Sequence, residues 1–332
     1  MVRSPANTRH RPAVARDPAE SVRGHAHAPP QVIGHAGLAI QRPGGVPTRR
    51  HLDELLALGV DRVELDVCTS ADGHLVVRHD ACLADGRFVA DLDLADLRSD
   101  DQFQLTLDEV CEHLEGRIPM LLDLKMAHAA QDLGGWFNRR RDLEMFTVCT
   151  ENLPWLLQLR FAAPRVARWP SFPNIGERSS HHVQQVVAGL WRSHASINGL
   201  RRGVSDLHGA ASQLRHHPHD SLARLGGLPW RERLPLELAQ PCEDLAAEGI
   251  CVQKWLISER LVEEAHGAGL HVNAWTINNT EVAHTVAAAG VDSITTDRVA
   301  AIQLALGIGK PPRLPASARG GRLRVAARSA PS

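Results

Sequence analysis

The chain has 332 residues, of which 43% are hydrophobic and 23% are charged, so it can bury a large core as one large domain or two ordinary ones. Its formal net charge of -1 gives no reason to expect a nucleic-acid partner, and no apolar run is long enough for membrane insertion. The six cysteines are scattered without a C-x-x-C pair, which indicates a reduced, cytoplasmic protein and not a zinc or disulfide framework.

Both ends of the chain are rich in small and basic residues and poor in large apolar ones. Residues 1–30 combine Pro, Ala, Arg and His, and residues 307–332 carry no acidic side chain. We expect both segments to be disordered, because they cannot bury enough apolar surface to offset the entropy lost on ordering. The first segment also lacks the apolar core of a secretory signal. The folded domain is therefore predicted over residues 31–306.

Between the tails, short apolar runs alternate with helix-like stretches. A first strand is predicted at residues 31–35, and the spacing of leucines then predicts a helix over residues 49–59 that stops at Gly59. The strand 61–67 leads through a turn at 70–73 into a further extended piece. The remaining strands are predicted at residues 118–125, 144–150, 164–169, 249–255, 270–278 and 291–297.

If the extended piece at residues 74–80 is counted as a decoration, the strands number eight and alternate with helices. That pattern predicts an α/β fold of the TIM (β/α)8 barrel type. The alternative is an open doubly wound sheet, which usually has fewer strands and a Gly-rich first turn; "GHAGLAIQRPGG" lacks G-x-G-x-x-G. Residues 170–241 break the even spacing, and we interpret them as an insertion between the fifth and sixth strands, a candidate lid.

Acidic residues interrupt two of the apolar strands. Glu64 and Asp66 point to the same side of their strand, and Asp123 and Lys125 share one face of the next. Burying even a polar group without a partner costs roughly 2–7 kcal/mol, and a charge costs more. The three acids would supply half of a six-coordinate oxygen site for a hard divalent cation, leaving Lys125 for an anionic substrate. The alternatives are salt bridges, including an Asp123–Lys125 pair, or strand ends in solvent.

Two histidines stand at positions that could reach the same end of the barrel. His35 ends the first strand, and His79 ends the extended piece after the second. A lone histidine is more often structural, but two beside a cation site could donate and accept protons near neutral pH.

An ordered series of motifs resembles the glycerophosphodiester phosphodiesterase family over residues 31–303, apart from the insertion. The matching stretches are "GHAG", "VPT", "GVDRVELDV", "TSADG", "VVRHD", "LDLK", "AWTIN" and "GVDSITTD". The resemblance implies a TIM barrel that hydrolyses glycerophosphodiesters, or related lipid-derived phosphodiesters, to glycerol 3-phosphate and an alcohol. It also implies a small-molecule phosphodiester as the partner and Ca²⁺ or Mg²⁺ as the cofactor.

The same resemblance implies roles for individual residues. Glu64, Asp66 and Asp123 would bind the metal, with Asp123 in place of the family's Glu. His35 and His79 would form the acid and base pair. Lys125 would contact phosphate, and Trp275 would either line the mouth on the glycerol side or pack in the core.

Two motifs depart from the family pattern. The Arg that follows the first His is Ala36 here, and the Glu and Asn of Glu-Asn-Thr fall on Val46 and Pro47, with Thr48 retained. The site thereby lacks one cation and one acid. The departures allow a different phosphodiester, a site rebuilt from insertion residues, or a catalytically weak barrel that binds a phosphodiester or metal ligand without efficient turnover. The retained histidine pair favours an enzyme.

Overall fold

The computed structural model describes residues 28–41, 45–172 and 234–309. The segments predicted as disordered, 1–30 and 307–332, lie almost wholly outside the described residues. Most of the predicted insertion lies outside them as well. Those predictions therefore remain predictions. No helix in the described part of the chain is both long and apolar enough to cross a membrane.

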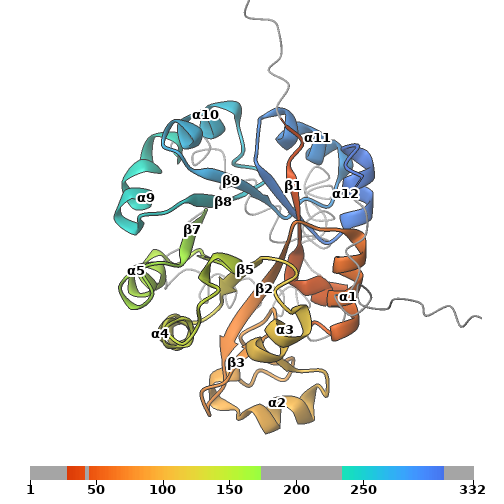
Figure 1. Cartoon of the computed structure of the whole chain (residues 1–332), viewed down its shortest axis with the longest axis vertical. Helices are drawn as coiled ribbons and strands as arrows, with labels where there is room; N and C mark the ends of the chain where they lie inside the picture. Colours follow the sequence, from red (N-terminus) through yellow and green to blue (C-terminus); the bar gives the residue numbers. More distant parts are fainter. Residues whose placement is uncertain (1–27, 42–44, 173–233, 310–332) are drawn as a thin grey trace, which may run out of the picture.

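Eight parallel strands close into a barrel around which the helices form an outer ring (Figure 1). Each strand pairs with the next along the chain, and β1 pairs with both β10 and β2, which closes the ring. The closure confirms the TIM barrel and excludes the open sheet. The barrel strands are β1 (Gln31–Gly34), β2 (Arg62–Thr69), β5 (Met120–Leu124), β6 (Phe146–Thr150), β7 (Ala167–Phe172), β8 (Gly249–Gln253), β9 (His271–Trp275) and β10 (Ser293–Thr296).

The helices begin and end at residues whose side chains suit those positions. Thr48 caps α1 by accepting a hydrogen bond from His51 N, and Gly59, where the helix was predicted to stop, ends it in the left-handed conformation. The helices are α1 (Arg49–Leu58), α2 (Leu94–Asp100), α3 (Leu107–Leu114), α4 (Ala127–Phe137), α5 (Leu153–Ala162), α9 (Ala239–Leu245), α10 (Glu259–Gly267), α11 (Thr280–Ala288) and α12 (Val299–Ala305), with 3-10 segments η2 (His35–Gln41), η3 (Val89–Asp91) and η4 (Leu143–Met145).

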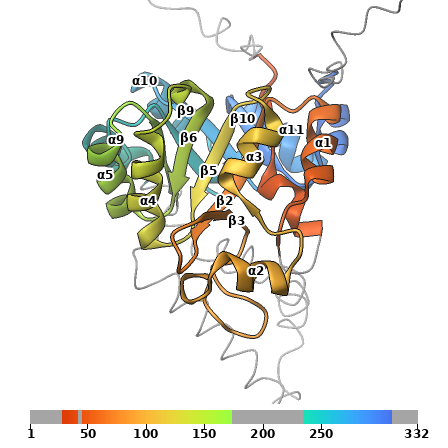
Figure 2. The ribbon, with the colours of Figure 1, turned by 60° about the horizontal axis from the view of Figure 1, so that its bottom comes forward.

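An antiparallel excursion leaves the barrel after β2, as predicted for the decoration. The chain turns at Ser70–Gly73, where Ser70 Oγ donates to Asp72 Oδ1 (2.6 Å) and Gly73 takes a φ of 80°. It returns as β3 (Leu75–Val77) beside the end of β2, and β3 pairs in turn with β4 (Leu105–Thr106). Figure 2 shows this excursion, with α2, projecting beyond the barrel strands.

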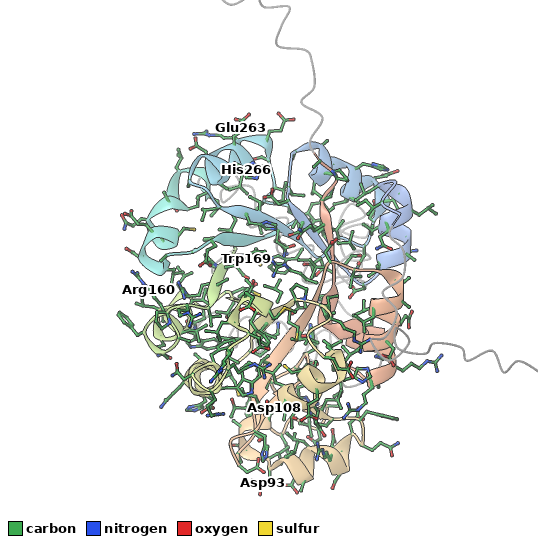
Figure 3. All side chains as sticks on the ribbon, in the orientation of Figure 1. Asp93, Asp108, Arg160, Trp169, Glu263 and His266 are labelled. Atoms are coloured by element: carbon green, nitrogen blue, oxygen red, sulfur yellow. The ribbon has the colours of Figure 1, made fainter. Side chains whose placement is uncertain are left out.

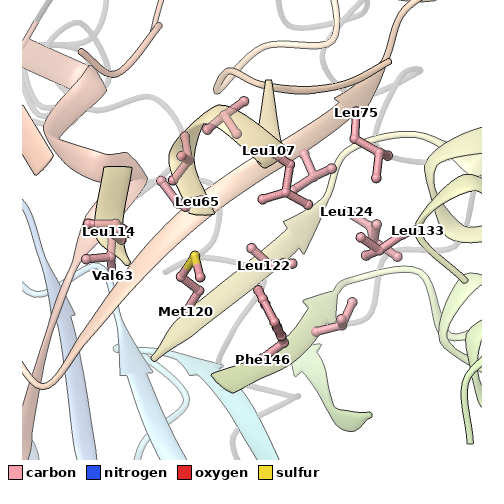
Figure 4. Packing of buried hydrophobic residues seen from close by; sticks show 14 of the residues in the cluster. Val63, Leu65, Leu75, Leu107, Leu114, Met120, Leu122, Leu124, Leu133 and Phe146 are labelled. Carbon is pink, nitrogen blue, oxygen red and sulfur yellow. The ribbon is translucent and has the colours of Figure 1, made fainter. Parts of the chain in front are cut away.

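Apolar side chains on the outer faces of the strands pack against the helices. Val63, Leu65 and Leu122 are fully buried there, among the side chains drawn in Figure 4. Charged side chains such as Glu263 lie on the outer helices, whereas Trp169 lies near the centre of the ring (Figure 3). Because side chains alternate along a strand, burying Val63 and Leu65 outward turns Glu64 inward. Because of this alternation, the acidic side chains of β2 point into the barrel.

Candidate active site

Three carboxylates meet at the carboxyl ends of β2 and β5. Asp66 and Asp123 lie opposite each other in the parallel register, and Glu64 lies two residues before Asp66 on the same strand. One ligand oxygen from each of the three acids lies within 4.8 Å of the others. Asp66 is only 2% exposed and Glu64 only 5%, so two of these acids are held inside the barrel. The structure thus brings together the three residues that the sequence predicted as metal ligands.

The charges of these acids are incompletely balanced. Burial, with Asp66 and Asp123 nearby, raises the pKa of Glu64 well above its usual value. The pKa of Asp123 is raised too, because burial outweighs the attraction of Lys125. The local groups that favour the ionised form of Glu64 include the backbone N–H of Ala36, which donates to Glu64 Oε2 at 2.6 Å. Carboxylates held this way would be stabilised by a further positive charge.

Lys125 is the cation that already sits among the acids. Its Nζ lies 2.6 Å from Asp123 Oδ2 and 2.8 Å from Asp66 Oδ1. Burial alone would lower the pKa of Lys125, but the carboxylates of Asp123, Asp66 and Glu64 raise it well above its usual value. The Asp123–Lys125 pair, which the sequence left open as an alternative, is therefore present in the structure.

One oxygen of the cluster, Asp66 Oδ1, is fully enclosed and accepts no hydrogen bond from the described residues, although Lys125 Nζ forms an ion pair with it at 2.8 Å. An all-oxygen donor set with a buried carboxylate oxygen that accepts no hydrogen bond suits a hard cation such as Ca²⁺ or Mg²⁺. The residues present therefore fit a divalent ion.

The two histidines lie at the same barrel mouth. The rings of His35 and His79 are edge to face, with centroids 6.2 Å apart. His35 begins η2, directly after β1, and its Nε2 is 3.8 Å from Glu64 Oε2. The backbone N–H of His79 donates to Gly45 O at 2.9 Å, and a Cβ at Gly45 would lie 2.8 Å from His79 Cβ. A glycine at position 45 therefore lets the loop approach His79 closely.

His35 is held by a carboxylate from the opposite end of the chain. Asp297 Oδ1 lies 2.7 Å from His35 Nδ1, and Asp297 Oδ2 accepts a hydrogen bond from Asn278 Nδ2 at 2.5 Å. Burial would raise the pKa of Asp297, but the hydrogen bonds from His35 and Asn278 keep it below its usual value. An ionised carboxylate can only accept, so Nδ1 of His35 carries a proton and Nε2 is directed into the site.

His79 has a carboxylate partner of its own. Its Nδ1 lies 3.0 Å from Asp80 Oδ1. This hydrogen bond, opposed by partial burial, raises the pKa of His79 above its usual value and so favours the imidazolium form. Each of the two histidines therefore has a carboxylate partner at Nδ1, which orients its ring and leaves Nε2 for other contacts.

Trp275 ends β9 and packs inside the barrel. It lies against the interior cluster of Ile33, Leu121, Cys149, Trp169 and Cys251, and its indole N–H has no hydrogen-bond acceptor in the described part of the chain. Its position is compatible with both roles considered from the sequence, a packed core aromatic and a wall of the mouth.

Where the motifs of this chain differ from the family pattern, apolar residues stand in place of charged ones. Ala36 is buried and has a φ of 48°, in a turn whose Gly37 and Leu38 are also left-handed. Val46 is completely buried. Neither position supplies the cation or acid of the family pattern.

Sequence reasoning did not assign three residues of this region. Asp297 and Asn278 were noted only as parts of motifs, and Glu151 was not noted at all. Burial and the charge of Asp123 raise the pKa of Glu151 to about 7. The signal available for Asp297 was its place at the end of the last strand, where the mouth of a TIM barrel lies.

Comparisons with known proteins agree with this geometry. The model of the glycerophosphoryl diester phosphodiesterase family matches residues 48–301, which include the three acids, His79 and Asp297 but begin after His35. A comparison with curated protein sequences found no match.

Solved structures resemble the chain over most of its length. One is an Oleispira antarctica phosphodiesterase in complex with the product sn-glycerol-3-phosphate: 21% identity, 84% of this chain and 97% of that one, TM-score 0.54. A glycerophosphodiester phosphodiesterase from Thermotoga maritima is 18% identical, and the match covers 84% of this chain and 99% of that one with a TM-score of 0.57. One from Parabacteroides distasonis is 16% identical, and the match covers 84% of this chain and 97% of that one with a TM-score of 0.57. At these identities the likeness shows the fold.

Proposed function

Because the chain belongs to the glycerophosphoryl diester phosphodiesterase family, a family of phosphoric diester hydrolases, we propose that it hydrolyses a glycerophosphodiester or a related lipid-derived diester to glycerol 3-phosphate and an alcohol. The reaction depends on a divalent cation, Ca²⁺ or Mg²⁺. The observation that carries this proposal is the meeting of three acids and two histidines at one mouth of the barrel. The proposed location is the cytoplasm, supported by six unpaired cysteines.

Glu64, Asp66 and Asp123 would hold the cation, whose bound charge would supply stabilisation for the phosphoryl oxygens as negative charge builds on them. Lys125 adds a second positive charge at the same place. Its flexible stem lets the ammonium turn toward an anionic diester, while the carboxylates around it keep it protonated.

His35 acts as the general base. Asp297 fixes the proton on Nδ1, so the neutral ring presents the Nε2 lone pair to the attacking hydroxyl, whether of substrate or water. Asn278 holds Asp297 in turn, with Asn278 Oδ1 accepting a hydrogen bond from the Asp297 backbone N–H at 3.0 Å. The ring is thus oriented before the substrate arrives.

His79 acts as the general acid. Its raised pKa keeps the imidazolium populated near neutral pH, and its ring lies across the site from His35. It can therefore protonate the leaving alkoxide oxygen while His35 takes the proton from the attacking group. Trp275 offers an apolar wall on the glycerol side of the substrate.

The second candidate function is a barrel that binds a phosphodiester or a metal ligand without efficient turnover. It is favoured by one observation: the positions of the family's Arg and Glu hold the buried apolar residues Ala36 and Val46. The oriented His35–Asp297 pair favours the enzyme, because a binder gains nothing from fixing a tautomer.

A substrate panel separates the two candidates. We expect hydrolysis of at least one of the choline, ethanolamine, inositol and glycerol diesters of glycerol 3-phosphate when Ca²⁺ or Mg²⁺ is present. His35→Ala should abolish it. His266→Ala is the matched control, because His266 also pairs with a carboxylate, Asp292 at 2.9 Å, but on an outer helix (Figure 3). If the ion raises thermal stability and no diester is cleaved, the binding function is the better description.

A further inference from the structure

Glu151 directly follows β6, the strand that pairs with β5 and so lies beside Lys125. Asp123 pairs with Cys149 in the parallel register of β5 and β6, and Thr150 Oγ1 donates to Leu124 O at 3.1 Å. Continued by two residues beyond the Asp123–Cys149 pair, this register sets Glu151 level with Lys125. Cys149 packs inside the barrel, and Glu151 is two residues further on, so both lie on the inward face.

Among the described residues, the carboxylate of Glu151 has no partner of its own. It is half-buried and forms no hydrogen bond or ion pair with the residues that the structure describes. Two nearby charges act on it: Asp123 disfavours its ionised form, and Lys125 favours it. Glu151 is thus an acid within the electrostatic range of Lys125, on the side of β5 away from Asp66.

Lys125 contacts two of the carboxylates that a divalent cation would bind. Its ammonium lies 2.6 Å from Asp123 Oδ2 and 2.8 Å from Asp66 Oδ1, and these two acids belong to the cluster that fits the ion. An ammonium and a divalent ion held by the same two carboxylates repel each other. Binding of the ion therefore weakens the contacts of Lys125 with these carboxylates.

We propose that Glu151 is the alternative partner of Lys125, which receives the ammonium when the three acids bind the cation. Adjacent parallel strands are only about 4.8 Å apart, and the four-carbon stem of lysine can swing across that spacing. Glu151 then holds Lys125 beside the phosphate of the substrate. Glu151 is a positioning residue in this arrangement, and the inference rests on the cation-dependent function proposed above.

The test is a double-mutant cycle on Ca²⁺ affinity, measured by calorimetry on the full chain after removal of metal with a chelator. Glu151→Gln should weaken Ca²⁺ binding by about fivefold or more, since the displaced ammonium loses its partner. Lys125→Met should tighten binding because the competing charge is gone. In the Lys125→Met background, Glu151→Gln should change the affinity less than about twofold.

Glu144→Gln is the matched control, because Glu144 is exposed in η4, just before β6, and should leave Ca²⁺ affinity unchanged. Each variant is first checked by thermal melting. If Lys125→Met does not fold, Lys125→Gln takes its place, since it also removes the charge while keeping a polar side chain.

Each contrary result has a distinct meaning. Equal weakening by Glu151→Gln with and without Lys125 would show that Glu151 acts on the ion directly and would overturn the inference. No effect of Glu151→Gln on Ca²⁺ affinity would overturn it as well. If the unmodified chain binds neither Ca²⁺ nor Mg²⁺, the proposed cation-dependent function is wrong, and the role inferred for Glu151 is wrong as well.

Discussion

Asp297→Asn is expected to remove the general base without moving it. Asp297 Oδ2 accepts from Asn278 Nδ2, so an asparagine at position 297 must turn its carbonyl oxygen toward that donor. Its amide nitrogen then faces His35 Nδ1, 2.7 Å away in the unmodified chain, and donates to it. The proton of neutral His35 is forced onto Nε2, the atom that should accept the proton of the attacking group.

The size of the expected loss of activity follows from the groups that Asp297→Asn leaves intact. The acids, Lys125 and His79 are untouched, so binding and electrostatic stabilisation remain and only base catalysis is lost. That contribution is roughly 100- to 10,000-fold, and an aspartate-to-asparagine change behind a catalytic histidine belongs at the upper end. The activation free energy should rise by about 3–5 kcal/mol. The assay is kcat and KM for the diester that is cleaved fastest, with KM expected to change little.

A swap of the two side chains provides the control. In Asn278→Asp combined with Asp297→Asn, the carboxylate at 278 accepts from the amide at 297, which frees the carbonyl oxygen of position 297 to accept from His35. Part of the lost kcat should return. The reasoning would be refuted if Asp297→Asn alone kept kcat within about threefold, a change too small for general base catalysis.

Three further outcomes are expected. Asp80→Asn removes the main cause of the raised pKa of His79, so the alkaline limb of the kcat profile should move to lower pH; an unmoved limb would remove His79 as the acid. Gly34→Ala would place a Cβ against a leucine of α1 and should lower the free energy of unfolding, measured in urea, by about 1–3 kcal/mol. Gly135→Ala is the control, because position 135 on α4 has open space around it, and this change should raise the free energy of unfolding by about 1 kcal/mol at most. Partial burial lowers the pKa of half-buried His271 from 6.5 to about 4, so the unfolded chain binds the proton first as pH falls. The free energy of unfolding should therefore drop between pH 6.5 and 4 by at most about 3 kcal/mol, and a flat profile there would contradict a neutral ring at position 271 in the folded protein.

The strands and the acid cluster could be predicted because both depend on local periodicity. Val63, Leu65 and Val67 define the outer face of β2, and the opposite face then follows for Glu64 and Asp66. The alternation of strands and helices gave the order of the barrel, and parallel neighbours placed Asp123 beside Asp66. Strand ends were less accurate. The fifth strand was predicted over residues 164–169, whereas β7 spans Ala167–Phe172.

The contacts that orient the site could not be predicted from local sequence patterns. His35 and Asp297 are 262 residues apart in the chain and meet only because β1 pairs with β10 when the barrel closes. Glu151 follows the last residue of a strand, where polar residues are ordinary, so nothing in its neighbourhood marks it. Its relation to Lys125 depends on the register of β5 and β6, which periodicity alone does not give.

The most direct measurement follows glycerol 3-phosphate release from the preferred glycerophosphodiester by phosphorus NMR, using chain stripped of metal and then titrated with Ca²⁺ or Mg²⁺. The proposed function predicts negligible release without the ion, saturable recovery with it, and no recovery in Glu64→Gln at the same ion concentrations. Full release by the stripped chain, or equal recovery in Glu64→Gln, would contradict a reaction that depends on a cation held by Glu64, Asp66 and Asp123.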